Sequence, residues 1–272
     1  MAPRTARRID RSLPWPALTL ALLAMVFFAL PIAGLLSRTP WRDIGATLRR
    51  PAIRDALRLS IVCSVCATVI SVVFGLPLAW LLSRRRFPGR SLVRALCTLS
   101  MLLPPVVGGV ALLTALAPGG LVGGSLDRWF GVRLPFTTTA VVIAQTFVAM
   151  PFFVVTVEAA LRHVDTGHDE AARTLGASSW YAFRRITLPA VRPALIAGAL
   201  LSWARAFGEF GATVTFAGIF PGHTQTLPLS VYTTLATDPK QSIVIALLMV
   251  AVALAVLLAL RDRWTVAGVL TA

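Results

Sequence analysis

Two charged residues interrupt an otherwise apolar stretch in the last third of the chain. Arg205 and Glu209 stand four residues apart in a run that is long enough to cross a membrane. Residues at i and i+4 share one helix face, so we expect an ion pair. A charge at the bilayer centre costs about 2.5–3.5 kcal/mol on the insertion scale. The pair is therefore either part of a translocation path or gate, or a structural salt bridge.

Small, hydroxyl-bearing and proline residues accompany this pair. The small residues predict a surface for close helix approach: Ala204, Gly208, Gly211 and Ala212. Four threonines offer hydroxyl donors that suit an anion, although threonine also bonds its own helix carbonyls: Thr213, Thr215, Thr224 and Thr226. Pro104 and Pro105 should bend an earlier apolar helix. That bend serves either a moving gate or a fixed shape.

The cysteines and histidines give little support for a metal or redox site. Cys63 and Cys66 form a C-x-x-C pair inside an uncharged run, without a second pair or a nearby histidine. We interpret them, like Cys97, as small apolar residues of a membrane helix. The histidines are separated in the sequence: His163, His168 and His223. We expect no metal site, and no Ser/His/Asp set indicates an enzyme.

Composition indicates a membrane protein. Of 272 residues, 57% are apolar and 14% are charged, whereas a soluble chain has about 25% charged residues. The net charge is +15, and the arginines form short clusters between apolar runs. That placement is typical of loops beside anionic lipid and follows the positive-inside rule, so we expect no nucleic-acid partner.

The apolar runs predict an all-α polytopic membrane protein with about six transmembrane helices and a polar loop on the cytoplasmic side. The domain covers residues 13–262, after a cytoplasmic N-terminus at 1–12. The expected spans are 13–37, 59–83, 95–117, 134–160, 191–212 and 241–260. The first run is longer than a signal-peptide core and ends in no A-x-A-like site, so we interpret it as a retained helix.

Charge distribution supports this topology with one exception. Inner segments hold 16 Lys and Arg residues and outer loops hold 9. The first outer loop violates the rule with six arginines: Arg38, Arg42, Arg49, Arg50, Arg54 and Arg58. Either residues 44–59 form an amphipathic helix on the outer face, or the first helix is misjudged.

The polar stretch 165–189 is too charged to cross a bilayer and predicts two short helices. Asp165 or Thr166 is expected to cap the first helix, with Asp169 and Glu170 near its positive end. Gly176 suits the left-handed position that ends a helix, and Ser178 the cap of the next one. The aromatic residues Trp180, Tyr181 and Phe183 suit a membrane interface. The alternative is an ordinary amphipathic loop.

This stretch resembles the EAA loop of binding-protein-dependent ABC importers. The match consists of Glu170-Ala171-Ala172, Gly176 and Ile186-Thr187-Leu188-Pro189 with the family's spacing. We call residues 165–189 the EAA loop. The resemblance implies a coupling helix that docks on a separate ATPase subunit, with Glu170 at the contact and Gly176 at the turn. ATP would then be bound by the partner, and this chain would need no cofactor.

Further motifs make the chain most similar to molybdate permease subunits, and sulfate permeases share much of the same pattern. These motifs are Leu103–Gly109, Arg205–Thr213 and Pro221–Leu229. The resemblance implies an oxyanion importer in the bacterial cytoplasmic membrane, an external binding protein and a homodimer of this chain. An ion-gradient transporter or channel is the competing class. It would predict more buried carboxylates and inverted repeats, which the sequence lacks.

Overall fold

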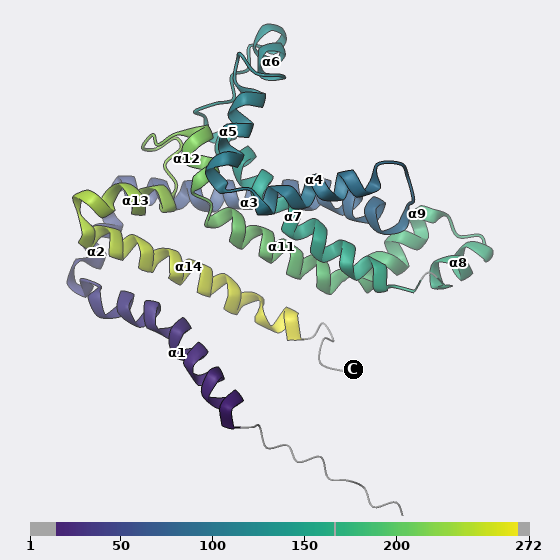
Figure 1. The fold of residues 1–272 in the computed structure, drawn as a ribbon, viewed down its shortest axis with the longest axis horizontal. Helices are drawn as coiled ribbons and strands as arrows, with labels where there is room; N and C mark the ends of the chain where they lie inside the picture. The colour runs from purple at the N-terminus through teal and green to yellow at the C-terminus, as the bar shows by residue number, and fades with distance from the viewer. Residues whose placement is uncertain (1–14, 166, 266–272) are drawn as a thin grey trace, which may run out of the picture.

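The computed structural model describes residues 15–165 and 167–265, and all regular structure in these ranges is helical (Figure 1). The predicted all-α class is confirmed. Residues 1–12 and Thr166, which the sequence assigned to the N-terminus and to a cap, lie outside the described residues.

Sixteen short and long helical elements make up the described chain. They are α1 (Trp15–Arg38), η1 (Trp41–Asp43), α2 (Ile44–Arg49), α3 (Pro51–Arg84), α4 (Arg90–Leu102), α5 (Pro105–Leu116), α6 (Gly123–Phe130), α7 (Thr138–His163), α8 (Gly167–Thr174), α9 (Ser179–Ala182), η2 (Phe183–Thr187), α10 (Leu188–Ala190), α11 (Arg192–Phe207), α12 (Gly211–Ala217), α13 (Leu227–Thr237) and α14 (Pro239–Thr265).

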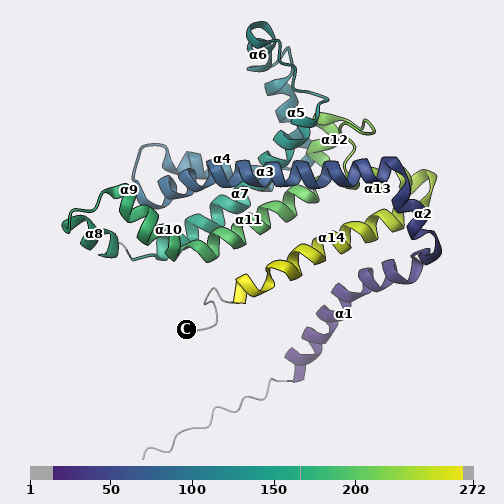
Figure 2. The same cartoon turned by 180° about the vertical axis from the view of Figure 1, so that it is seen from behind.

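Helices α3, α7 and α11 form the centre of the bundle and run side by side (Figures 1 and 2). One buried alanine from each helix meets at their junction: Ala67, Ala149 and Ala206. The buried ring of Phe153 lies between two glycines. A Cβ on Gly75 would lie 2.8 Å from Phe153 Cδ1, and one on Gly198 would lie 3.2 Å from Cδ2. Small residues therefore let the three backbones approach closely, as is usual between membrane helices.

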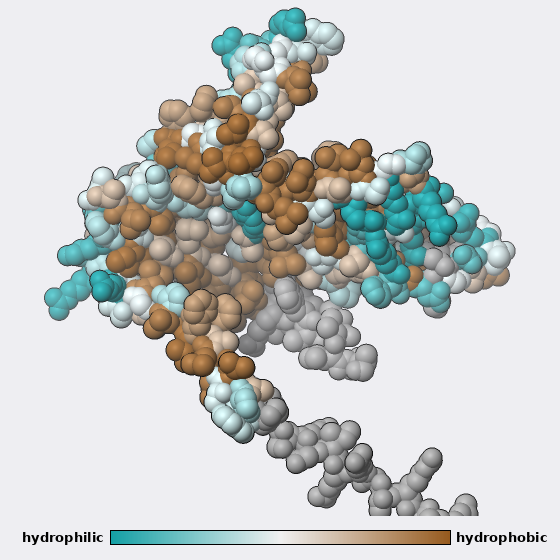
Figure 3. Space-filling model, in the orientation of Figure 1, coloured by the Kyte–Doolittle hydropathy of each residue, from teal (hydrophilic) through white to brown (hydrophobic). Residues whose placement is uncertain are grey.

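Four helices of the described chain are long and apolar enough to cross a membrane. They are α1, α3, α7 and residues 239–259 of α14. A fifth span results if the residues from Ser179 to Ala190 and helix α11, which meet at a 70° bend, count as one. Figure 3 shows apolar side chains over the middle of the bundle and hydrophilic ones over α8 and α9 at one end. This distribution suits a bundle surrounded by lipid.

Two of the expected spans are each divided into two helices in the structure. Residues 95–117 divide into α4 and α5, because Leu103 and Pro104 are extended (ψ 134° and 132°) and Pro105 begins the new helix. A residue before proline avoids the helical region, and proline suits the first helical position. Residues 191–212 divide likewise, since α11 ends at Phe207 and α12 begins at Gly211.

Residues 44–59 do not form the single surface helix that was one of the two alternatives for this loop. Helix α2 ends at Arg49, and the extended Arg50 (ψ 127°) leads to Pro51, which begins α3. The residues after Pro51 therefore belong to the long central helix. Proline again sets the boundary, since its fixed φ and missing N–H favour the first turn.

Candidate functional site

The EAA loop projects from the end of the bundle between α7 and α11 (Figure 1). The backbone N–H of Gly167 donates to Asp165 Oδ1 at 2.9 Å, which caps α8. The N–H of Tyr181 donates to Ser178 Oγ at 3.2 Å, which caps α9. Both predicted caps are confirmed. Each satisfies a backbone donor that a helix N-terminus leaves open.

Gly176 makes the turn between the two short helices. Its φ is +89°, in the left-handed region that glycine adopts without a steric penalty, so this prediction is confirmed. The N–H of Ala177 donates to the carbonyl of Ala172 at 2.9 Å, and the N–H of Gly176 to that of Arg173 at 3.0 Å. These bonds close the C-terminus of α8. The shape of the turn is thus set by the backbone conformation of Gly176 and by hydrogen bonds within the loop.

The outer side of this turn presents small residues beside two large exposed side chains, Leu175 and Tyr181. Leu175 is 88% exposed. We call the surface around it the tip surface: Ala172, Leu175, Gly176, Ala177, Ser178 and Tyr181. Glu170 and Ala171 lie on α8 just before it, and both are exposed. An exposed apolar group at a polar end of the molecule marks a surface suited to contact with another protein.

The last residues of the family motif occupy a different place. Ile186 lies in η2, and Leu188 and Pro189 lie in α10, where the chain returns to the bundle. Ile186 and Leu188 are half-buried, while Pro189 is exposed. The structure therefore separates the motif into an outward group on α8 and a supporting group at the base of the loop.

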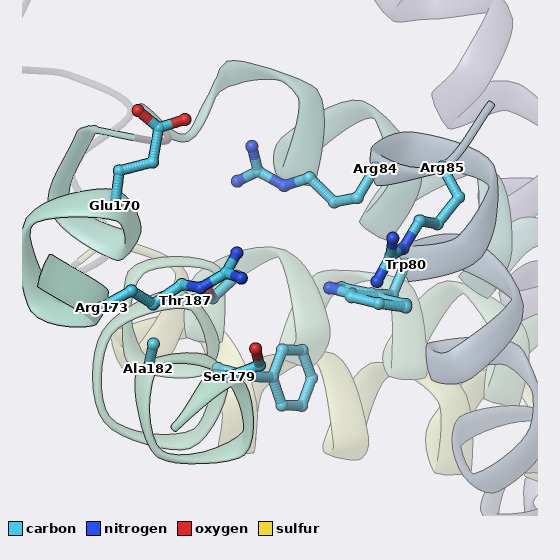
Figure 4. Close-up of a pocket in the computed structure, with 9 residues that line it drawn as sticks. Trp80, Arg84, Arg85, Glu170, Arg173, Ser179, Ala182 and Thr187 are labelled. Atoms are coloured by element: carbon cyan, nitrogen blue, oxygen red, sulfur yellow. The ribbon is translucent and has the colours of Figure 1, made fainter. Parts of the chain in front are cut away.

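A pocket of about 310 Å³ lies between α8–α9 and the C-terminal end of α3 (Figure 4). It is lined by Trp80, Arg84, Arg85, Glu170, Arg173, Ser179, Ala182, Phe183 and Thr187. Arg84 Nη2 donates to the carbonyl of Val164 at 3.2 Å, and the Arg85 guanidinium lies 5.6 Å from the centroid of the Trp80 ring. The pocket is rich in positive charge.

The second predicted region is the break between α11 and α12. Glu209 is 1% exposed, and its carboxylate forms an ion pair with Arg205, as expected from their spacing. The N–H of Ala212 donates to Glu209 Oε1 at 2.7 Å. A carboxylate near a helix N-terminus is favourable because it accepts a free backbone donor. Glu209 thus joins the end of α11 to the start of α12.

This break packs directly against the proline break of the earlier span. A Cβ on Gly211 would lie 2.6 Å from Pro105 Cβ. A Cβ on Gly109 of α5 would lie 2.7 Å from Thr215 Cβ and 2.9 Å from the carbonyl of Ala212. We call this contact of α5 with α12 the break junction. Gly208 takes no part in it, since a Cβ there would meet only the Ala204 carbonyl at 3.5 Å.

The four candidate threonines differ in their partners. Thr215 Oγ1 donates to the carbonyl of Gly211 at 2.9 Å, and Thr224 Oγ1 to that of Gly218 at 3.1 Å. Both therefore bond the local backbone. Thr213 and Thr226 are fully buried, and their hydroxyls have no hydrogen-bond partner among the described residues. The latter two keep donors that a polar ligand could use.

The sequence interpretation overlooked one buried carboxylate. Glu158 of α7 is 5% exposed and accepts from Arg94 Nη2 at 2.5 Å and from Arg162 Nη2 at 2.6 Å. Arg94 Nη2 also donates to the carbonyl of Leu82 at 3.3 Å. Glu158 falls inside the expected span 134–160, so it is a further charge within the predicted spans besides Arg205 and Glu209. The i, i+4 spacing of Glu158 and Arg162 was the available signal.

Gln145 was also overlooked. It lies in the middle of α7, is fully buried, and neither amide atom has a partner among the described residues. Its helix neighbours Val142 and Ala149 pack with Ala67 and Ala206. Gln145 therefore faces the junction of α3, α7 and α11. An isolated glutamine inside an apolar run is the sequence signal that marks it.

Thiols and other metal-binding groups are dispersed. In the described ranges Cys63, Cys66 and Cys97 are free, and no group of three His, Cys, Asp or Glu side chains is placed to hold a metal ion.

An all-helical bundle with several apolar spans, broken helices and a projecting polar loop is the architecture of a multi-pass membrane protein. The family model described as "Binding-protein-dependent transport system inner membrane component" matches residues 71–267. This chain belongs to that family of inner-membrane transport components.

Relatives and solved structures agree with the family. The chain is 40% identical to the molybdenum transport system permease protein ModB of Mycobacterium tuberculosis (strain ATCC 25618 / H37Rv), over 89% of this chain and 92% of that protein. It is 34% identical to the sulfate transport system permease protein CysT of Escherichia coli (strain K12), over 80% and 81%. A bacterial ABC transporter for alginate import has the same fold, with a TM-score of 0.70, 17% identity, and coverage of 95% and 96%.

Proposed function

We propose that this chain is the membrane-spanning subunit of an ATP-driven importer that carries a tetrahedral oxyanion, molybdate, into a bacterial cell. The observation that supports the substrate best is the 40% identity to molybdenum permeases over 89% of the chain. The buried hydroxyls of Thr213 and Thr226 also suit an oxyanion, because its oxygens accept hydrogen bonds.

ATP binding and hydrolysis belong to a partner subunit in this proposal. Glu170, Ala171, Ala172 and Gly176 form the docking face, which the exposed tip surface supports. Ile186, Leu188 and Pro189 hold the base of the loop against the bundle. Motion of the ATPase then reaches the membrane helices through the 70° bend between α10 and α11. This chain itself performs no catalysis and needs no cofactor.

The translocation gate lies at the break junction in this proposal. Arg205, Glu209, Thr213 and Thr215 come from the second broken span, and Pro104 and Pro105 from the first. Two broken helices in tight contact move as a unit when α11 tilts. The near-neutral Arg205–Glu209 pair keeps Glu209 from repelling an anion.

Two copies of this chain enclose the path. The Arg205 side chain is 28% exposed in the single chain. A guanidinium open to lipid is costly, so a second copy that covers the junction is favoured. An external binding protein delivers the substrate, as the family description indicates for its members.

Substrate identity is tested on the binding protein that pairs with this permease. Calorimetric titration with molybdate, tungstate and sulfate should show molybdate bound at least tenfold more tightly than sulfate. Uptake by the assembled transporter should then be competed by molybdate and not by equimolar sulfate. Preferred binding and uptake of sulfate would support the second candidate, a sulfate permease subunit, for which the 34% identity to CysT speaks.

A further inference from the structure

The pocket between α3 and the EAA loop is lined by three arginines, Arg84, Arg85 and Arg173, and by one carboxylate, Glu170. Arg84 and Arg173 reach toward its middle, and the Glu170 carboxylate points away from them (Figure 4). Among the described side chains, no carboxylate lies within ion-pair distance of Arg84, Arg85 or Arg173. Like charges that converge on one small space repel each other, so an anion between them would be stabilised.

The sequence of α3 indicates that the pocket lies near the boundary between the hydrocarbon and the headgroups of a membrane. Helix α3 is a candidate span, its uncharged run ends at Ser83, and Arg84 is its last residue. Trp80 lies one turn earlier, at the depth where tryptophan is enriched in membrane proteins. A ligand that reaches this pocket from the bilayer would present its headgroup to the arginines.

Aromatic side chains beside the arginines favour a lipid over a free ion. Phe183 lines the pocket and packs edge-to-face on Trp80, with 6.3 Å between ring centroids. Trp180 stacks on Phe183 at 5.7 Å and is 68% exposed. A small inorganic anion makes no use of such rings, whereas the glycerol and acyl region of a lipid packs against them.

We propose that this pocket binds the phosphate headgroup of an anionic phospholipid. Arg84 and Arg173 contact the phosphate oxygens, because guanidinium groups match phosphate in charge and geometry. Arg85 lies over Trp80 at the rim. The lipid thereby links the end of α3 to α8 of the EAA loop. This site goes beyond the proposed function and does not depend on which substrate the transporter carries.

Native mass spectrometry of the purified full chain with phosphatidylglycerol or phosphatidylcholine tests the site. Phosphatidylglycerol should bind several-fold more tightly. Arg173→Gln changes an exposed residue of the loop and should weaken phosphatidylglycerol binding about fivefold. A basic residue near an anionic membrane surface contributes about 1 kcal/mol, which corresponds to about this factor in affinity. Arg84→Gln should weaken binding to the same extent. The matched control Arg192→Gln removes an exposed arginine outside the pocket and should leave binding unchanged.

Three results would overturn the lipid site. Equal affinity for the two lipids would show that the arginines do not select an anionic headgroup. An equal loss in Arg192→Gln would show a general charge effect at the membrane surface. Displacement of phosphatidylglycerol by millimolar inorganic phosphate would assign the pocket to a free anion, because the aromatic rings would then contribute nothing.

Discussion

The EAA loop and the break junction are stabilised in different ways. The loop is exposed and holds its shape through backbone hydrogen bonds, two side-chain caps and one left-handed glycine. The break junction is buried and holds its shape through close packing of Gly109 and Gly211 and an internal ion pair. The proposed docking surface therefore lies outside the hydrophobic core, while the proposed gate is part of the core. Substitutions should therefore separate stability from association.

Loss of Arg205 should have the largest effect on stability. Arg205→Ala leaves the Glu209 carboxylate buried without its partner. Breaking a buried pair in this way costs about 3 kcal/mol, the lower end of the usual range, because the arginine is partly exposed. Denaturant unfolding of the purified chain in detergent measures it. The double variant Arg205→Ala/Glu209→Gln should recover most of the loss, since the charge is removed while an acceptor for Ala212 remains. No recovery would show that the pair is not the cause.

A larger side chain in the break junction should have the second-largest effect on stability. Gly211→Leu places side-chain atoms where Pro105 already lies, since even a Cβ would come within 2.6 Å. We expect a loss of about 1–3 kcal/mol in the free energy of unfolding, as is typical of overpacked sites. Gly208→Ala is the control, because its Cβ makes only an ordinary contact. Equal unfolding midpoints for both variants would contradict the close packing of α5 on α12.

Removing a cap from the EAA loop should have a smaller and local effect. Ser178→Ala deletes the acceptor of the Tyr181 N–H and should destabilise α9 by about 1 kcal/mol. Hydrogen exchange followed by mass spectrometry should show faster exchange at Tyr181, with unchanged protection in α7 and α11. Ser179→Ala, next to it, should exchange like the original chain. Faster exchange across the whole bundle would instead mean that the loop and the core are one cooperative unit.

Charge reversal at Glu170 should leave stability within about 0.5 kcal/mol, because the residue is exposed. Glu170→Lys should instead weaken co-purification of the ATPase subunit at least tenfold. Asp55→Lys makes the same charge change at an exposed residue near the start of α3 and should co-purify normally. Full co-purification with Glu170→Lys would remove this residue from the docking face.

The sequence predicted features that depend on local chemistry. Asp165, Gly176 and Ser178 each take the role that their residue type favours, because caps and left-handed turns are settled within a few residues. The Arg205–Glu209 pair follows from helix periodicity in the same way. Thr166, the alternative cap of the first short helix, and the side chain of Asp169 lie outside the part of the chain that the structure describes.

Features that depend on tertiary contacts were not predictable. Pro104 and Pro105 were expected to bend a helix, yet they end it, and the packing of Pro105 on Gly211 joins segments far apart in sequence. Glu158 is buried because Arg94 from another helix reaches it, and no local pattern shows that contact. The same holds for the pocket on α3, since Arg84 and Arg173 are brought together only by the fold.

The position of the tip surface relative to the membrane tests the account most directly. A cysteine at Leu175 in a chain without Cys63, Cys66 and Cys97 gives one exposed thiol at the turn. A membrane-impermeant maleimide applied to intact cells should leave it unlabelled, and permeabilised cells should label it fully. A cysteine at Gly119, in the open turn after α5, is the control expected to react in intact cells. Labelling of residue 175 in intact cells would place the loop outside, where no ATPase could reach it.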